Sequence, residues 1–332
     1  MMNTLLEKSS PESIAAAARI ILEGGLVAFP TETVYGLGAN ALSADSCIKI
    51  FEAKKRPFFD PLICHVSSVE MIDRIAFAED TALTVFDKFS PGPITVVMKK
   101  KEIIPSIVTS GMDTVAVRIP MHDTALSLIK YSDVPIAAPS ANPFGFLSPT
   151  EAVHVYDSLH GRIDMIIDGG KCSVGVESTI VSFLDGKLSV LRPGGIGVEE
   201  LQDVLKMKAE IYSGDLKSAP GMLESHYAPV KKLVLIEEGE AADFSSAALL
   251  SFRGQNASRA EHFEVLSRSG DVREAAANLF SALHKIDQLP VSMIYAEMIP
   301  EDGIGLAVMN RLRKASAERK YDFETNSDLT KA

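Results

Sequence analysis

The chain has 332 residues, more than one ordinary hydrophobic core organises, so we expect two domains. Hydrophobic residues make up 46% and charged residues 23%, a composition typical of globular proteins. The formal net charge of −11 argues against a broad phosphate-binding face, because such faces gather Lys and Arg. We therefore expect small molecules as the direct ligands, and weak or no direct binding of nucleic acid.

Neither a membrane segment nor a secretion signal is predicted. The apolar runs, such as residues 246–252, are too short to span a bilayer, and the first residues place no apolar stretch after a basic one. The cysteines Cys47, Cys64 and Cys172 are far apart and form no CxxC pair. These features predict a cytoplasmic protein with reduced thiols.

In the first 213 residues, predicted strands outnumber predicted helices. Ser10 and Pro11 are typical of a helix start, and Gly24 with Gly25 ends that helix. Further helices are expected over residues 44–53 and after the capping residues Ser67, Asp80, Asp123 and Thr150. Strands are expected over residues 26–29, 62–66, 94–98, 114–119, 135–138, 165–167, 179–183 and 188–191. So many strands require some antiparallel pairs, so we predict an α/β domain with a mixed sheet over residues 1–213.

The pattern changes after this domain. Residues 214–229 are rich in Gly, Pro, Ser and Ala and are predicted to form a linker. Over residues 230–325, strands at 233–236, 247–252 and 291–296 alternate with helices at 271–289 and 303–316. That alternation predicts a smaller, Rossmann-like parallel α/β domain. The last residues, 326–332, are predicted to be a flexible tail.

A basic stretch, Lys54-Lys55-Arg56-Pro57, follows the helix at 44–53. In an extended segment Lys54 and Arg56 point to the same side, and two converging cations suit a polyphosphate. The alternative is a solvated charge run at a helix end, which the spacing alone favours.

Arg118 lies in an apolar strand, on the opposite face from Val115, Val117 and Ile119. A guanidinium in such surroundings needs an anionic partner. That partner is either a buried Asp or Glu or the carboxylate of a substrate, and the sequence favours neither.

Small polar and glycine residues gather where predicted strands end, in residues 138–142, 148–150, 168–170, 175–179 and 192–195. Ligands of open α/β sheets bind at strand ends, and loops without bulky side chains let backbone N–H groups approach a phosphate. The alternatives are a turn-rich connector and a β-hairpin with glycine turns.

Several common catalytic motifs are absent from the sequence. It has no GxxxxGK followed by Ser or Thr, no GxGxxG, no GxSxG and no HExxH. The seven histidines have no spacing typical of a metal site, so no protein-bound metal is predicted. By default His65 would be a core histidine.

Taken together, these stretches resemble the YrdC-type threonylcarbamoyl-AMP synthases. The matching segments are 30–37 (PTETVYGL), 54–57 (KKRP) with 60–63 (DPLI) and His65, 139–142 (PSAN), 148–150 (SPT), 175–180 (GVESTI) and 191–194 (LRPG). Each segment alone is weak, but together in this order they are highly specific. Segments 219–222 (APGM), 226–229 (HYAP), 303–307 (GIGLA) and 310–312 (NRL) further resemble the long, two-domain form.

The resemblance implies a YrdC-like twisted mixed sheet and an enzyme, a nucleotidyltransferase that makes threonylcarbamoyl-AMP and pyrophosphate from L-threonine, bicarbonate and ATP. This is the first step of N6-threonylcarbamoyladenosine formation in tRNA. It also implies Mg²⁺ bound with ATP, and a separate downstream tRNA threonylcarbamoyl transferase, so that direct tRNA binding is weak or absent.

The resemblance also assigns roles to residues. The threonine site would comprise Thr33, His65, Arg118, Ala138 and Ser178. The ATP site would comprise Arg56, Asp60, Thr114, Ser140, Asn142, Ser148 and Arg192. Lys54 and Arg56 would act in catalysis by offsetting charge on the pyrophosphate, and His226 and Tyr227 of the linker would form a lid over the site.

The sequence departs from the family at Lys55, where Gly is usual, at Phe58 and Phe59, where the segment is usually more polar, and at Pro143-Phe144. Three other functions are alternatives to the synthase. A module that binds RNA or the ribosome conflicts with the net charge of −11. A carbamoyl-transferring maturation protein would need a longer chain with CxxC pairs. An inactive relative would not need the polar residues at all these positions.

Overall fold

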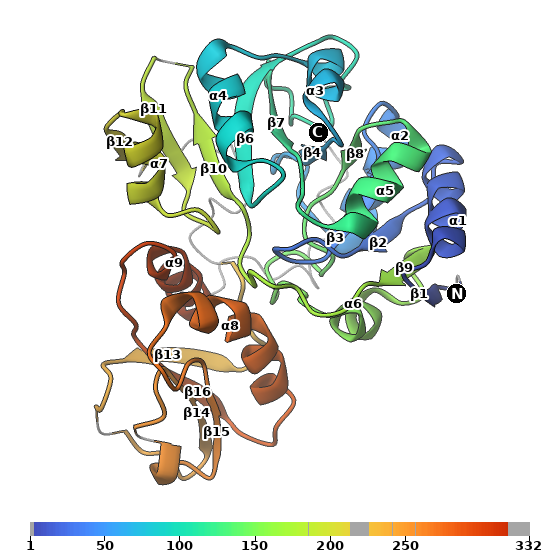
Figure 1. Cartoon of the computed structure of the whole chain (residues 1–332). Coiled ribbons are helices and arrows are strands. Elements are labelled where there is room, and N and C mark those ends of the chain that lie inside the picture. The colour runs from blue at the N-terminus through green and yellow to red at the C-terminus, as the bar shows by residue number, and fades with distance from the viewer. Residues whose placement is uncertain (1–2, 185, 213–225, 241, 256, 318–332) are drawn as a thin grey trace.

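The computed structural model describes residues 3–317 except 185, 213–225, 241 and 256, and shows two α/β domains (Figure 1). Described strands of the first domain form one sheet in the order β1-β9-β2-β3-β8-β4-β7-β6-β10-β11-β12, with β5 beside β6. They are β1 (Leu5–Lys8), β2 (Val27–Phe29), β3 (Gly36–Asn40), β4 (Ile63–His65), β5 (Ala76–Phe77), β6 (Ile94–Lys100), β7 (Thr114–Arg118), β8 (Ile136–Ala137), β9 (Met165–Asp168), β10 (Thr179–Ser182), β11 (Leu188–Arg192) and β12 (Ala209–Ile211).

Both pairing directions occur in this sheet, which confirms the predicted mixed sheet. β4 and β7 run parallel, whereas β8 lies antiparallel to both β3 and β4. The described helices of this domain are α1 (Pro11–Leu22), α2 (Ala44–Lys54), α3 (Val69–Ile75), α4 (Asp80–Phe89), α5 (Asp123–Ser132), α6 (Ala152–Leu159) and α7 (Val198–Leu205). α1 packs on α5, and α4 packs on β6 and α7.

The first helix shows how the local sequence sets a boundary. The hydroxyl of Ser10 accepts a hydrogen bond from the Ser13 amide, and the Ser13 hydroxyl accepts one from the Ser10 amide. This capping box satisfies two of the free amides at the helix start. Buried Ile14 and Ile21 lie on the face turned to the core, as the apolar spacing predicts.

Four of the predicted N-cap residues lie one position away from the N-cap residues of the structure. Ser68, Glu79, His122 and Glu151 are the N-cap residues in place of the predicted Ser67, Asp80, Asp123 and Thr150. Neighbouring polar residues compete for the cap position, and the turn of the preceding chain decides between them.

Strand β3 was not predicted, because Gly36 and Gly38 make its sequence read as a loop. A Cβ at Gly38 would lie 2.8 Å from side-chain carbons of both Ile136 and Phe29. Glycine therefore allows close packing across the sheet here. β1, β5, β12 and α7 were also not predicted; β1 and β12 are largely exposed and lack a clear apolar pattern.

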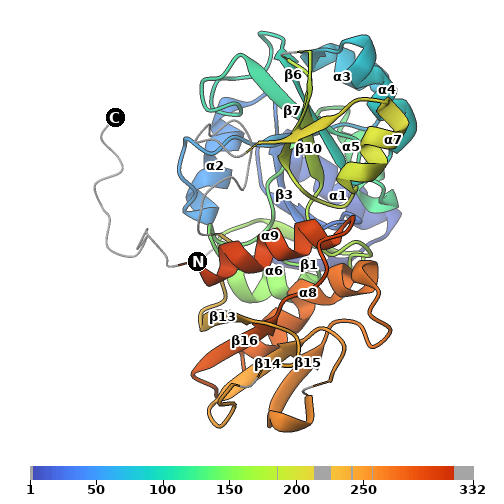
Figure 2. The same ribbon diagram turned by 90° about the vertical axis from the view of Figure 1, so that its left-hand side faces the viewer.

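The second domain contains a four-stranded sheet in the order β13-β16-β14-β15, with every pair parallel. Its strands are β13 (Lys232–Ile236), β14 (Ala247–Ser251), β15 (His262–Val265) and β16 (Met293–Glu297), and its helices are α8 (Val272–Asp287) and α9 (Gly305–Ser316). The predicted parallel domain is confirmed, although β15 was missed. Both helices lie on the side of the sheet that faces the first domain (Figures 1 and 2).

Of the predicted linker, only residues 226–229 are described; residues 214–225 and the predicted tail, 326–332, lie outside the described residues. The amide of Ala228 donates to the Gly145 carbonyl (2.9 Å), and the amide of His226 donates to the Lys314 carbonyl (3.3 Å). The end of the linker is thus bound to both domains. Within the described part of the chain, no helix is long and apolar enough to cross a membrane.

Two histidines stack across the domain boundary. The rings of His154 in α6 and His284 in α8 lie 3.9 Å apart at 14°. His154 Nδ1 accepts a hydrogen bond from the Thr150 amide, and His284 Nε2 lies 3.1 Å from the Ser148 carbonyl. Burial, together with the charges of His284 and Lys171, lowers the pKa of His154 to about 3. The pair therefore stays largely uncharged at neutral pH.

We expect acid to destabilise this contact. His154 titrates near 6.5 when unfolded, so the unfolded chain binds more protons below that pH, and stability is lost as the pH falls from about 6.5 towards 3. Over this range, the free energy of unfolding falls by about 1.4 kcal/mol per histidine for each pH unit. The decrease in melting temperature between pH 7.5 and pH 5.5 should be smaller for His154→Phe than for the unaltered protein. His160→Gln, at an exposed position on the same side of the domain, should leave the decrease unchanged; an equal decrease in all three proteins would contradict the prediction.

Candidate active site

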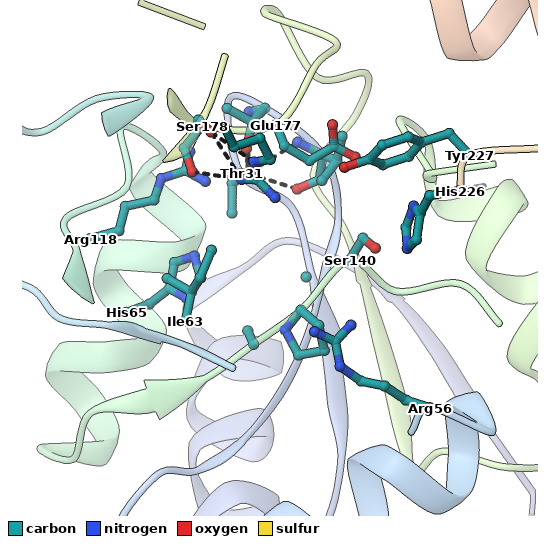
Figure 3. A pocket seen from close by; sticks show the side chains of 16 residues that line it. Thr31, Arg56, Ile63, His65, Arg118, Ser140, Glu177, Ser178, His226 and Tyr227 are labelled. Carbon is teal, nitrogen blue, oxygen red and sulfur yellow. Dashed lines mark hydrogen bonds between the residues drawn. The ribbon is translucent and has the colours of Figure 1, made fainter. Parts of the chain in front are cut away.

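A cavity of about 50 Å³ lies where several strands of the first domain end (Figure 3). Arg118 and His65 lie on one side of it, Arg56 and His226 on the other, and Ser140 between them. The lining residues are Thr31, Thr33, Val34, Gly36, Arg56, Ile63, His65, Arg118, Ala138, Pro139, Ser140, Glu177, Ser178, Arg192, His226 and Tyr227. Residues from positions 31 to 227 thus meet at one place.

All five residues predicted to bind threonine line this cavity: Thr33, His65, Arg118, Ala138 and Ser178. His65 and Arg118 occupy paired positions at the ends of the parallel strands β4 and β7. Ala138 follows β8, whose neighbour in the sheet is β4. The sheet order, which sequence patterns do not reveal, therefore brings these positions together.

Arg118 forms an ion pair with Glu32, with 2.7 Å between Nη2 and Oε1. Both side chains are almost fully buried, and the other carboxylate oxygen of Glu32 accepts a hydrogen bond from the Met121 amide. The two alternatives for Arg118 are therefore not exclusive. Its buried partner within the chain is Glu32, yet the guanidinium also lines the cavity, where it can meet a ligand carboxylate.

His65 is buried in the cavity wall and packs edge-on against Phe29, with 6.1 Å between ring centroids. Burial and the charge of Arg118 lower its pKa to about 3, so the imidazole is neutral at physiological pH. Its Nδ1 has no hydrogen-bond partner among the described residues. A neutral imidazole with a free ring nitrogen can bind a hydroxyl or carboxyl group of a ligand.

Of the residues predicted to bind ATP, Arg56, Ser140 and Arg192 line the cavity. Arg56 pairs with Asp60 (3.0 Å) and donates to the Asp60 and Pro61 carbonyls, and its guanidinium lies over the Phe144 ring. Asp60 itself does not line the cavity. Burial raises its pKa, while the charges of Arg56 and Lys54 act in the opposite direction.

Arg192, at the end of β11, binds the neighbouring segment of the wall. Its Nη2 donates to the carbonyl of Ser178 (2.9 Å) and to its hydroxyl (3.2 Å). The same hydroxyl is hydrogen-bonded to Thr95 (2.7 Å). Ser178 is thus held from two sides and faces both predicted ligand sites.

Thr114, Asn142 and Ser148 do not line the cavity. Thr114 begins β7 and Arg118 ends it, about 13 Å further along the strand, and side chains two residues apart share a sheet face. The apolar side chains of Ile63, Val97, Ala116 and Ile180 form a separate cluster. Ile63, which lines the cavity, and Val97 both pair with Ala116, which lies between Arg118 and Thr114 on β7. The cluster therefore extends from the cavity towards Thr114 along that face of the sheet.

Lys54 is the last residue of α2, and Lys55 adopts a left-handed conformation (φ 52°). The expectation of an extended segment at residues 54–56 is therefore wrong. A left-handed residue favours glycine, which explains why the family usually has Gly at position 55. The ammonium of Lys54 donates to the carbonyls of Ser140 (2.5 Å) and Asn142, so it holds the loop of the cavity wall and does not itself line the cavity. Burial and the charge of Arg56 set its pKa well below its usual value.

His226 and Tyr227 of the linker close one side of the cavity. Their rings meet edge to face at 4.1 Å, and His226 also packs against Phe144 at 5.3 Å. Tyr227 adopts a left-handed conformation (φ 61°) and is 2% exposed. A non-glycine residue in this conformation is held there by its surroundings, which fix the rings against the cavity.

Two carboxylates of the cavity region, Glu32 and Glu177, were not predicted as site residues, although both lie within the matched segments. Arg311 of the second domain, which pairs with Glu177 (2.9 Å), was likewise not predicted as a site residue. Among the described residues, no three His, Cys, Asp or Glu side chains gather where they could hold a metal ion.

Comparisons with known proteins agree with this geometry. A sequence model of the Sua5, YciO and YrdC proteins, described as "Telomere recombination", matches residues 19–194, and one described as "Threonylcarbamoyl-AMP synthase, C-terminal domain" matches residues 196–317. The chain therefore belongs to the Sua5/YrdC family. Within it, the chain belongs to the two-domain threonylcarbamoyl-AMP synthases, which are enzymes of the nucleotidyltransferase type.

Relatives named threonylcarbamoyl-AMP synthase match nearly the whole chain. The protein of Pyrococcus abyssi is 44% identical, over 94% of this chain and 96% of its own length. The protein of Bacillus subtilis is 40% identical, over 95% of each. A crystal structure of P. abyssi Sua5 complexed with L-threonine matches with a TM-score of 0.86 and 42% identity, covering 95% of this chain and 97% of the other.

We expect Arg118→Ala to lower the free energy of unfolding by about 3–5 kcal/mol, because it leaves the Glu32 carboxylate buried without its counter-charge. The double variant Glu32→Gln, Arg118→Ala should regain part of this loss, since it removes both charges. Urea unfolding of the three proteins measures the difference. A double variant less stable than Arg118→Ala would show that the ion pair is not the source of the loss.

Proposed function

We propose that this enzyme makes threonylcarbamoyl-AMP and pyrophosphate from L-threonine, bicarbonate and ATP, for N6-threonylcarbamoyladenosine formation in tRNA. The observation that carries the proposal is the cavity itself. It joins Arg118, His65 and Ser178, which suit an amino acid, to Arg56 and Arg192, which suit phosphates. The similarity to a structure complexed with L-threonine, at 42% identity, supports it.

In the first step, the amine nitrogen of threonine forms a bond to the carbon of bicarbonate, and water leaves, giving a carbamate. Arg118 would bind the threonine carboxylate, neutral His65 its hydroxyl or carboxylate, and Ser178 with the Ala138 backbone and Thr33 would complete the site. A fixed orientation supplies much of the rate in such reactions, because the reactants are held in the reacting geometry.

In the second step, a carbamate oxygen forms a bond to the α-phosphorus of ATP, and the bond to pyrophosphate breaks. Arg56 and Arg192 would stabilise the negative charge that moves onto the phosphates. Asp60, Thr114, Ser140, Asn142 and Ser148 remain the other proposed ATP-binding residues. The apolar cluster beside Thr114 offers a surface for an apolar part of the nucleotide.

Lys54 is a proposed catalytic residue, but it does not line the cavity. Bonded to the loop carbonyls, it would act by keeping Ser140 and Asn142 in position rather than by meeting the pyrophosphate, unless its side chain turns when ATP binds.

Mg²⁺ is proposed to arrive with ATP. The described carboxylates of the site are engaged by arginines, so phosphate oxygens and water would hold the ion, as is usual for Mg²⁺ with nucleotides. When bound, it would neutralise part of the phosphate charge.

The linker residues His226 and Tyr227 are proposed to shield the site from water. Both residues line the cavity and are almost fully buried, at 5% and 2% exposed. The linker would move to admit ATP. Its closure over the product would protect the reactive acyl phosphate bond from hydrolysis. The product would pass to a separate tRNA threonylcarbamoyl transferase in the cytoplasm.

The reaction is tested by incubating the protein with ATP, Mg²⁺, bicarbonate and one amino acid at a time, and measuring pyrophosphate. We expect release only when threonine and bicarbonate are both present. Release with no amino acid, or equally with all of them, contradicts the proposal.

We expect Arg118→Lys to raise the KM for threonine by about tenfold or more, because an ammonium cannot replace the two-pronged contact of a guanidinium with a carboxylate. The KM for ATP should change much less. Arg74→Gln, which alters an exposed arginine paired with Asp133, is the matched control. An unchanged KM for threonine would remove Arg118 from the threonine site.

A further inference from the structure

One arginine of the second domain reaches into the wall of the site. Arg311 lies in α9, the helix that faces the first domain in Figure 2, and it is 1% exposed. Its Nε donates to the Glu177 carboxylate (2.9 Å) and its Nη1 to the Pro193 carbonyl (2.6 Å). The guanidinium also lies over the Tyr227 ring, 5.2 Å from its centroid. A single side chain thus joins two loops of the first domain and the linker.

Glu177, the partner of Arg311, lines the cavity. Its second carboxylate oxygen accepts a hydrogen bond from the hydroxyl of Ser148 (2.5 Å), a residue of the proposed ATP site. Burial acts to raise the pKa of Glu177, but the charges of Arg311 and Arg192 lower it overall. The carboxylate is therefore charged and depends on these two arginines.

Removal of Arg311 would leave this buried carboxylate with Arg192 as its remaining arginine. A buried carboxylate without its counter-charge is costly, so Arg192 would move towards Glu177. Arg192 would then be drawn from the phosphates it is proposed to bind, and the Ser148 hydroxyl would lose its orientation.

A second cation of α9 lies in the same cluster of charges. Lys314 follows Arg311 by three residues and so lies on the same face of the helix. Partial burial, together with the charges of Arg311 and Arg192, lowers its pKa to about 8. This face of α9 is therefore directed at the site rather than at solvent.

We propose that Arg311 is a positioning residue of the active site, supplied by the second domain, which holds Glu177 and Ser148 and keeps Arg192 available for ATP. The second domain is then part of the nucleotide site. This inference rests on the proposed function, because Ser148 and Arg192 are assigned to ATP there.

The test compares Arg311→Gln with Arg313→Gln. Arg313 lies on the same helix but pairs with Glu301 at the surface, with 49% of its side chain exposed. We expect Arg311→Gln to raise the KM for ATP about tenfold or more, which corresponds to about 1.4 kcal/mol, and the KM for threonine less than about threefold. Arg313→Gln should leave both unchanged. Equal KM values for ATP in the two variants, or an equal rise for both substrates, would overturn the proposal.

A second variant covers the case in which Arg311→Gln does not fold. Glu177→Gln, Arg311→Gln removes both buried charges, so its melting temperature should exceed that of Arg311→Gln and Arg192 should be released. We expect its KM for ATP to lie between those of Arg311→Gln and the unaltered protein. A KM at or above that of the single variant would overturn the proposal.

Equilibrium binding separates this inference from the reaction. Titration calorimetry of ATP with Mg²⁺ needs no turnover, so it measures the role of Arg311 even if the unaltered protein releases no pyrophosphate. Weaker ATP binding by Arg311→Gln than by Arg313→Gln supports the inference, and equal binding contradicts it. Absence of pyrophosphate from the unaltered protein contradicts only the proposed reaction.

Discussion

Pairing of buried charge is the interaction on which the site depends. Three arginines around the cavity each lie against a carboxylate: Arg56 against Asp60, Arg118 against Glu32, and Arg311 against Glu177, at 3.0, 2.7 and 2.9 Å. Unpaired, such groups would be too costly to bury. The pairs allow the protein to keep cations in a buried site, where they act on a ligand more strongly than they would in bulk water.

The mixed sheet determines where these charges meet. A purely parallel sheet would require a helical crossover between neighbouring strands. Here β8 is inserted antiparallel between β3 and β4, so the chain leaves β8 at Ala138 beside Ile63, at the start of β4, where the Ala138 amide donates to the Ile63 carbonyl (2.9 Å). The loop that follows β8 is then held by Lys54 from the end of α2. Short strands and loops therefore build the site, and the helices support it from outside.

The two domains share a wall of this site rather than merely lying next to each other. α9 reaches Glu177 through Arg311, and His226 of the linker is bonded to the backbone of Lys314. His154 and His284 stack nearby across the same boundary. The second domain thus supplies the buried counter-charge of Glu177, a residue that lines the cavity.

The sequence by itself determined the elements whose signal is local. The start of α1 at Ser10 and the strand-helix alternation of the second domain could be predicted, because each depends on residues close together in the sequence. β3 could not, since Gly36 and Gly38 are favoured by the packing of Phe29 and Ile136, which no local pattern reports. The segments of the site were likewise recognisable in the sequence as polar loops after strands.

Only the tertiary structure decided which of these groups meet. The pairing of Arg118 with Glu32 spans more than eighty positions, and that of Arg311 with Glu177 more than a hundred and thirty. The sequence left the partner of Arg118 open because a buried carboxylate and a ligand satisfy the same local pattern. It left Arg311 without a role because a charged residue in an amphipathic helix is usually solvated. Burial by a distant segment changes that expectation, and burial is a property of the folded chain.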